Sequence, residues 1–172
     1  MGEASCLFAR LAIARNTCLM KLEAYQVYSW RSDAGVPQFV DEGHLTVMDA
    51  KCGICAKGAR WIARADTAEQ FRIIPQQSAL GAALLVHFGM DPDDPVSWLY
   101  LANGRASSSL DGMIRAGAQL GGVWRALIIL RILPRGVQDW LYMRLARNRY
   151  RLFGAGDLCA MPDPDVQKRL LQ

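Results

Sequence analysis

The sequence reads Leu45-Thr46-Val47-Met48-Asp49-Ala50-Lys51-Cys52-Gly53-Ile54-Cys55 at the point that decides the fold. The short, mostly apolar run 45–48 is typical of a buried strand. After it, apolar residues recur at spacings near three and four, which indicates a helix that begins near Cys52. The two cysteines are therefore expected at positions i and i+3, in the first turn of a helix that follows a strand.

Two thiols in one helical turn lie on the same side of the helix, near enough to form a disulfide. The partial positive charge at a helix N-terminus favours the thiolate of the first cysteine, Cys52. This arrangement predicts a dithiol that closes and reopens as a disulfide. The stretch therefore indicates redox chemistry.

Short apolar runs alternate with helical patterns in the residues that follow. We expect strands at 45–48, 71–74 and 96–102, and helices at 52–65, 78–88 and 110–120. Pro75 closes the second strand because it has no N–H to donate. Ser78 and Ser109 are the expected N-caps of the second and third helices.

The dipeptide Asn103-Gly104 predicts a hairpin turn, so the strands on either side of it are expected to be antiparallel neighbours. Gly121-Gly122 ends the third helix, and two more helices, 124–133 and 136–148, are separated by Pro134. The sequence thus predicts an α/β protein with a small mixed sheet of about four strands. Helices flank this sheet, and extra helices follow at the C-terminal end.

This order of elements resembles the thioredoxin fold. More specifically, the chain resembles the DCC family of predicted thiol-disulfide oxidoreductases, which is named for an Asp-x-x-Cys-x-x-Cys motif and is represented here by residues 49–55. The resemblance extends over roughly residues 28–162. Further matching stretches are Phe71-Arg72-Ile73-Ile74-Pro75-Gln76-Gln77-Ser78, Asn103-Gly104-Arg105, Leu133-Pro134-Arg135 and Ala146-Arg147-Asn148-Arg149-Tyr150-Arg151-Leu152-Phe153-Gly154.

The chain departs from the family pattern at Ala50, where the family usually has glycine after the motif Asp. Alanine disfavours positive φ, so a slightly different turn is expected there. The resemblance implies a thioredoxin-like thiol-disulfide oxidoreductase.

We expect Cys52, exposed at the start of the helix, to attack a substrate disulfide, and Cys55, one turn deeper, to resolve the mixed disulfide. The neighbouring Lys51 would also favour the Cys52 thiolate. Asp49 has two open interpretations: it exchanges protons with Cys55, or it forms an Asx-turn or helix cap. The expected partners are a disulfide-containing substrate and an external thiol reductant.

Pro95 precedes the third expected strand, where thioredoxin-like proteins place a cis-proline opposite the dithiol. This role is a supporting prediction, because most X-Pro bonds in folded proteins are trans. Cys159 is either a third redox partner or, more simply, a bystander.

Two other interpretations of the cysteine pair remain open. One is half of a zinc site. The other potential ligands form no second close-spaced pair; they are Cys6, Cys18, Cys159, His44 and His87. The second is a pair of small buried hydrophobic residues. Attachment of c-type haem is excluded, because residue 56 is Ala and not His. We predict no metal and no cofactor.

The chain has 172 residues, a net charge of +4 and five cysteines. This length predicts one domain, at 44–162, between an N-terminal extension and connecting segment at 1–43 and a C-terminal tail at 163–172. The cysteines are odd in number and widely spaced, which favours a protein of the reducing cytoplasm over one that is held together by a disulfide scaffold. Residues 1–20 weakly resemble an organellar presequence, with a frayed extension as the simpler interpretation. No apolar stretch is long enough for a membrane span.

Seven arginines and one acidic residue, Asp139, lie between Val123 and Arg151. One interpretation is that these arginines, together with the aromatic residues among them, form a surface that binds an anionic membrane or a nucleic acid. We favour amphipathic helices with solvated arginines and the following residues turned inward: Leu127, Leu130, Trp140, Leu141 and Leu145. We therefore expect no nucleic-acid partner, and membrane-surface contact is the less favoured alternative.

Overall fold

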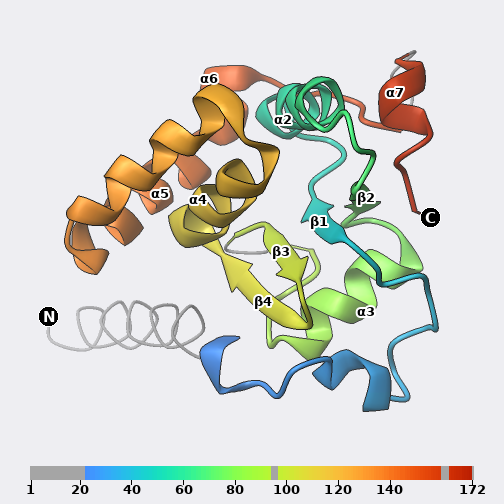
Figure 1. Ribbon diagram of the computed structural model, residues 1–172. Helices are drawn as coiled ribbons and strands as arrows, with labels where there is room; N and C mark the ends of the chain where they lie inside the picture. Colours follow the sequence, from blue (N-terminus) through green and yellow to red (C-terminus); the bar gives the residue numbers. More distant parts are fainter. Residues whose placement is uncertain (1–21, 94–96, 160–162, 172) are drawn as a thin grey trace, which may run out of the picture.

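A mixed sheet of four strands lies between two layers of helices (Figure 1). The computed structural model describes residues 22–93, 97–159 and 163–171. Pro95, Cys6 and Cys18 lie outside the described residues, as does the expected extension at residues 1–20. The strands are β1 (His44–Met48), β2 (Phe71–Pro75), β3 (Leu99–Ala102) and β4 (Arg105–Ser108).

The sheet has the order β2-β1-β3-β4. Strand β1 is parallel to β2 and antiparallel to β3, and β3 is antiparallel to β4. Helix α2 (Gly53–Ala65) joins β1 to β2, and α3 (Ala79–His87) lies between β2 and β3. The predicted thioredoxin-like α/β fold is confirmed.

The second half of the chain is mainly helical. It contains α4 (Ser109–Leu120), the 3-10 helix η3 (Gly122–Ile132), α5 (Arg135–Arg147), α6 (Arg149–Phe153) and α7 (Pro164–Gln167). Two short 3-10 helices, η1 (Leu22–Ala24) and η2 (Ser29–Ser32), precede β1. In the described part of the chain, every helix is too short or too polar to cross a bilayer.

The predicted hairpin is confirmed at Asn103 and Gly104. Both residues have positive φ, 51° and 74°, as a two-residue turn between antiparallel strands requires. A Cβ at Gly104 would lie 2.4 Å from a methyl group of Val27, and the Gly104 carbonyl accepts a hydrogen bond from Tyr28 N at 2.8 Å. The segment before β1 is therefore packed directly over this turn.

Two of the predicted helix boundaries hold and one is shifted. Ser78 caps α3 by accepting a hydrogen bond from Gly81 N at 3.0 Å, and Gly121 ends α4 with a φ of 74°. The cap of α4 was predicted one residue late. Ser108 is the N-cap, whereas Ser109 is the first helical residue, and its buried hydroxyl has no hydrogen-bond partner among the described residues.

The predicted strand 96–102 is shorter than expected and begins at Leu99. The polar groups just before it bond to Ser109 of α4 and Tyr142 of α5 and not to the sheet. Ser97 Oγ accepts a hydrogen bond from Ser109 N at 2.7 Å and donates to Tyr142, and Trp98 N also approaches the Tyr142 hydroxyl at 3.4 Å.

The helix predicted at 124–133 is a 3-10 helix. Trp124, Leu127, Leu130 and Leu133 recur every three residues and are half-buried, whereas the other side chains between them are exposed. A 3-10 helix has three residues per turn, so this spacing places all four on one side.

The prediction that Trp140 and Leu141 face inward is wrong. These side chains are 61% and 43% exposed, and the polar Gln138 is buried in their place. Gln138 lies inside because its amide donates to the Leu133 carbonyl at 2.7 Å.

The two faces of the sheet use alternate residues of each strand. Leu45, Val47 and Leu101 point to one face, where they meet Leu84 of α3 and Phe88, the residue that caps its C-terminal end. Leu22, Trp30 and Val36 also belong to this cluster, so residues before the predicted boundary at 43/44 contribute to the core. Polar contacts support this packing, because His87 on α3 bonds to Ser29 Oγ at 2.8 Å and to Asp33 at 2.6 Å.

On the opposite face, Met48, Phe71, Ile73 and Tyr100 pack against α2 and α4. The described part of the predicted tail, 163–171, also docks here. Ile73 N donates to the Arg169 carbonyl, and Leu171 N donates to the Ile73 carbonyl, both at 2.8 Å. The chain after α7 thus extends the sheet beside β2.

Candidate functional site

The two cysteines lie where the chain passes from β1 into α2. Cys52 is the N-cap, with extended backbone, and its carbonyl accepts the first helical hydrogen bond from Ala56 N at 3.0 Å. Cys55 lies in the first turn, and the two thiols are hydrogen-bonded to each other. The structure therefore brings together the two thiols that the spacing predicted to be neighbours.

The environment separates the pKa values of these thiols. A hydrogen bond from the Cys55 thiol is the largest cause that lowers the pKa of Cys52, to about 6. Burial opposes this shift, whereas backbone N–H groups at Cys55 and Ile54 support it. The same thiol–thiol bond and burial raise the pKa of Cys55. At neutral pH, the pair therefore consists of a Cys52 thiolate and a Cys55 thiol.

The prediction that Cys52 is exposed is wrong. Its exposed fraction is 0%, whereas Cys55 is only half-buried and lines a cavity. Cys52 is covered by residues 153–156, which we call the covering segment. Gly53 N donates to the Gly154 carbonyl at 3.1 Å, and Gly156 N donates to the Lys51 carbonyl at 2.9 Å.

Gly53, between the cysteines, permits this close approach. A Cβ at position 53 would lie 2.3 Å from the Phe153 carbonyl oxygen. A side chain here would therefore push the covering segment away from the dithiol. Across the same contact, Cys52 and Ala155 form an isolated antiparallel bridge.

Asp49 is buried beside the dithiol, and both of its carboxylate oxygens accept hydrogen bonds. Oδ1 accepts from Lys51 N at 3.0 Å and from the Gln77 amide at 2.9 Å. Oδ2 accepts from the Tyr150 hydroxyl and lies 3.4 Å from the Arg149 guanidinium. Burial alone would raise the pKa of Asp49, but these donors outweigh it and the net shift is downward.

The contact with Lys51 N is the Asx-turn that was one of the two interpretations of Asp49. The Lys51 side chain is exposed, and the lowered pKa of Cys52 comes first from the hydrogen bond with Cys55. Cys159 is exposed and is not among the residues that line the cavity beside Cys55.

Three residues around Asp49 were not predicted as site residues: Gln77, Arg149 and Tyr150. Each lies in a stretch that matches the family, 71–78 or 146–154. That match was the available signal, but these residues are 28 to 101 positions away from Asp49. Local spacing therefore could not connect them with the motif.

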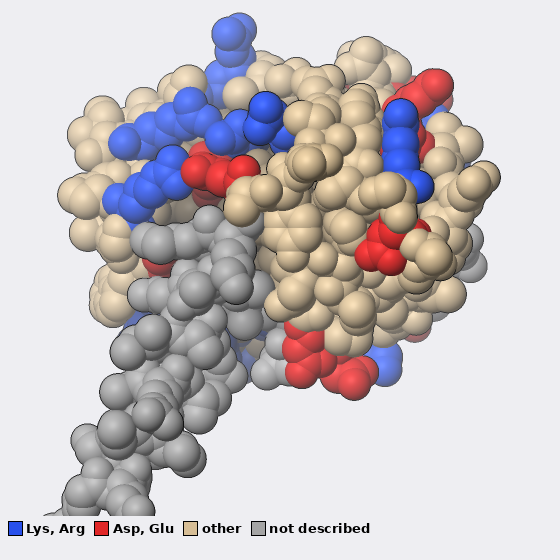
Figure 2. Space-filling view, turned by 90° about the horizontal axis from the view of Figure 1, so that it is seen from below, with Lys and Arg blue, Asp and Glu red and all other residues tan. Residues whose placement is uncertain are grey.

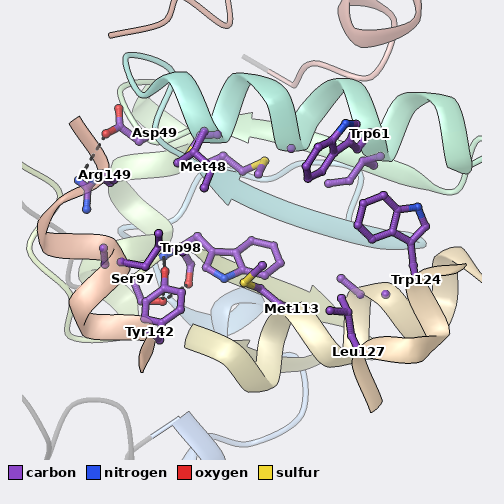
Figure 3. Close-up of a pocket in the computed structure, with 18 of the residues that line it drawn as sticks. Met48, Asp49, Trp61, Ser97, Trp98, Met113, Trp124, Leu127, Tyr142 and Arg149 are labelled. Atoms are coloured by element: carbon purple, nitrogen blue, oxygen red, sulfur yellow. Dashed lines mark hydrogen bonds and ion pairs between the residues drawn. The ribbon is translucent and has the colours of Figure 1, made fainter. Parts of the chain in front are cut away.

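A cavity of about 210 Å³ opens beside Cys55. Helices α2 and α4 form its longer walls, and η3 and α5 complete it (Figure 3). Trp61 and Trp124 stand together at one end, with ring centroids 5.2 Å apart, and Asp49 and Arg149 lie at the other end. The wall is largely apolar, but its polar end adjoins the dithiol.

Among the described residues, no group of three or more His, Cys, Asp or Glu side chains is placed to hold a metal ion. The predicted absence of a metal and the zinc alternative both stay predictions, because Cys6 and Cys18 lie outside the described ranges.

Two adjacent thiols at the start of the helix after β1, in an α/β fold of this topology, define a thioredoxin-like dithiol protein. Residues 46–155 match the family model of the DCC1-like thiol-disulfide oxidoreductases. The chain therefore belongs to this family, and the family name implies thiol-disulfide oxidoreductase activity at the family level.

Two relatives agree with this assignment. "Uncharacterized protein YuxK" from Bacillus subtilis is 28% identical over 127 residues, which cover 74% of this chain and 93% of that protein. "DCC family protein At1g52590, chloroplastic" from Arabidopsis thaliana is 28% identical over 122 residues, which cover 70% of this chain and 71% of that protein. No solved structure matches the chain significantly.

Proposed function

We propose that this chain is a thiol-disulfide oxidoreductase that reduces disulfides with the Cys52–Cys55 dithiol. The observation that carries the proposal is the hydrogen-bonded thiol pair at the start of α2, in which Cys52 has a pKa of about 6. The thiolate is the nucleophile in disulfide exchange, and a pKa near ambient pH combines a high thiolate fraction with good nucleophilicity.

In the proposed reaction, the Cys52 thiolate attacks one sulfur of the substrate disulfide. A bond forms between that sulfur and Cys52 as the substrate S–S bond breaks, and the other half leaves as a thiolate that takes a proton from water. Cys55 then loses its proton to water, attacks the Cys52 sulfur and releases the second half as a thiolate, which is protonated in turn. Two electrons pass to the substrate. Two equivalents of an external thiol, which end as a disulfide, reduce the Cys52–Cys55 disulfide again.

Asp49 has a positioning role in this proposal. Its oxygens accept four donors and its pKa is lowered, which favours the turn-forming interpretation over proton transfer with Cys55. The carboxylate binds Arg149 and Tyr150 at the start of α6, the helix that leads into the covering segment. Its charge also opposes ionisation of both thiols.

The test is reaction of the prereduced protein with bis(2-hydroxyethyl) disulfide, followed by counting free thiols. Wild type is expected to lose two thiols, and Cys55→Ser is expected to stop at a mixed disulfide on Cys52. Cys52→Ser is expected to react at less than about one thousandth of the wild-type rate. Cys159→Ser is the matched control and keeps the wild-type rate; unchanged reduction in Cys52→Ser would contradict the proposal.

The proposal includes a cytoplasmic location, supported by the odd number of cysteines and by a dithiol that has to be reduced again. The substrate and the reductant enter it only by chemical class, as a disulfide and a thiol.

A second candidate function is binding to an anionic membrane surface. The observation that favours it is the exposure of apolar side chains among the arginines of η3 and α5, such as Ile132 at 83% and Trp140 at 61%. Figure 2 shows Lys and Arg side chains gathered on the side of the molecule that these helices form. Basic and exposed aromatic side chains together suit a lipid interface.

Cosedimentation with vesicles of phosphatidylcholine and phosphatidylserine tests this second function. Binding is expected at low ionic strength, with a marked decrease at 0.5 M salt. A Trp140→Ser and Ile132→Ser double variant is expected to bind more weakly, whereas Val40→Ser, at another exposed apolar position, serves as the control. Equal sedimentation with neutral and anionic vesicles would contradict it.

A further inference from the structure

The cavity beside Cys55 has the size and lining of a small-molecule site. Its volume of about 210 Å³ exceeds the roughly 150 Å³ of an engineered apolar cavity that binds benzene. Met48, Trp98 and Met113 lie between its two ends (Figure 3). An aromatic ring with a short linker therefore fits between the tryptophan pair and the dithiol.

The reactive end of the cavity carries a thiol in its wall. Cys55 lines the cavity and is hydrogen-bonded to Cys52. Cys52 has an exposed fraction of 0% and does not line the cavity, so its thiolate reaches a substrate sulfur there when the Cys55 side chain moves aside. Arg149 lines the same end, and within the described part of the chain its buried Nε has no hydrogen-bond partner.

The side of Cys52 that faces away from the cavity is occupied by the covering segment. Extended peptides are commonly recognised by adding a strand to an exposed backbone edge. Here the chain's own Ala155 forms an antiparallel bridge with Cys52, and Gly154 and Gly156 bond to its neighbours. The backbone of a protein substrate would have to displace this segment, whereas a small molecule in the cavity approaches the pair from the side where Cys55 lines the wall.

We propose that the cavity is the substrate subsite for a low-molecular-weight disulfide that carries an apolar group of about one aromatic ring next to its S–S bond. This inference rests on the proposed function and specifies its substrate class. The ring occupies the space between Met48, Met113 and the tryptophans, and the S–S bond lies at Cys55. The covalent steps and the electron balance are those of the exchange reaction described above.

The test compares two dialkyl disulfides of similar thiol acidity, bis(2-phenylethyl) disulfide and bis(2-hydroxyethyl) disulfide. The second-order rate constant for thiol loss by the prereduced full chain is measured with each. A buried ring is expected to favour the phenylethyl compound at least about tenfold. A ratio near one in the wild type would overturn the inference while leaving the proposed function standing; thiol loss with neither compound would contradict the proposed function itself.

Two variants that fill the cavity with a larger side chain, called filling variants, test whether the cavity causes the preference for the phenylethyl compound. Ala146 is half-buried and lines the cavity, so Ala146→Phe places a ring where the substrate ring is proposed to bind. Met113→Trp fills the same space from α4 and serves if the first variant does not fold. Either change is expected to reduce the phenylethyl to hydroxyethyl ratio at least fivefold.

The matched control is Ala126→Phe, because Ala126 is exposed on η3 and does not line the cavity. This variant is expected to retain the wild-type ratio. Retention of the ratio in both folded filling variants would overturn the inference. The same variants are also tested for reduction of the disulfides of insulin. If they reduce insulin more slowly but react with the phenylethyl compound at the wild-type rate, the inference would be overturned in favour of a protein substrate.

Discussion

The two faces of the sheet are packed differently, although the same strands supply both. On the face toward α3, aliphatic and aromatic side chains such as Leu84 and Phe88 are completely or almost completely buried. On the face toward α2 and α4, the packing leaves a cavity of about 210 Å³ beside Cys55. The comparison indicates that the first face supplies stability and the second leaves space for chemistry.

Large-to-small substitutions on the two faces should separate these roles most strongly. Leu84→Ala removes a fully buried side chain on the α3 face, so the free energy of unfolding is expected to fall by about 3 kcal/mol. Leu127→Ala removes a half-buried side chain from the cavity wall and is expected to cost about 1 kcal/mol. Urea denaturation measures both, and equal losses would break the comparison.

Asp49 tests the polar end of the cavity. Asp49→Asn removes the carboxylate that binds Arg149 and Tyr150, so the free energy of unfolding is expected to fall by about 2 kcal/mol. The pKa of Cys52 is expected to move further down, because the Asp49 charge opposes formation of the thiolate. Thiolate absorbance against pH gives the pKa, with Asp93→Asn as the exposed control. An upward shift of the Cys52 pKa would contradict the inference that the Asp49 charge opposes formation of the thiolate.

The pH dependence of thiol reactivity follows from the lowered pKa of Cys52. With a pKa of about 6, the thiolate fraction rises about tenfold between pH 5 and pH 7, and the rate of disulfide exchange is expected to rise with it. Since the folded-state pKa lies below that of an unfolded thiol, the thiolate also stabilises the reduced fold. Relative to Cys52→Ser, this contribution is complete above about pH 9 and decreases as the pH falls toward 6. A rate that rises only above pH 8 would contradict the assignment.

The smallest expected effect lies at the cap of α3. Ser78→Ala removes the oxygen that accepts from Gly81 N, which is expected to lower the free energy of unfolding by about 1 kcal/mol without changing the pKa of Cys52. Ser78→Thr keeps an acceptor oxygen and should retain most of the stability. If Ser78→Ala also changed the thiol titration, the two faces would not be independent.

Features that depend on neighbouring residues were predictable from the sequence. The Asn103-Gly104 turn, the cap at Ser78 and the pairing of Cys52 with Cys55 each depend on a spacing of one to three residues. The chemistry of each residue type restricts such local geometry strongly.

Features that depend on distant packing were not predicted. The covering segment reaches Gly53 from 100 residues further along the chain, and its close contact depends on the path of α6. Trp140 has the residue type of a core position, but Gln138 is buried in the same turn of the helix because of its bond to Leu133. Hydrophobic pattern does not specify which side of a peripheral helix meets the rest of the molecule.

The covering segment has a consequence for oxidative damage. A thiolate at neutral pH is the form most easily oxidised by peroxide, through sulfenic to irreversible sulfinic acid. Three backbone hydrogen bonds, donated by Gly53, Gly156 and Leu158, hold the segment and the residues just after it against the motif. On the side that this segment covers, access of peroxide to Cys52 therefore depends on how often these bonds open.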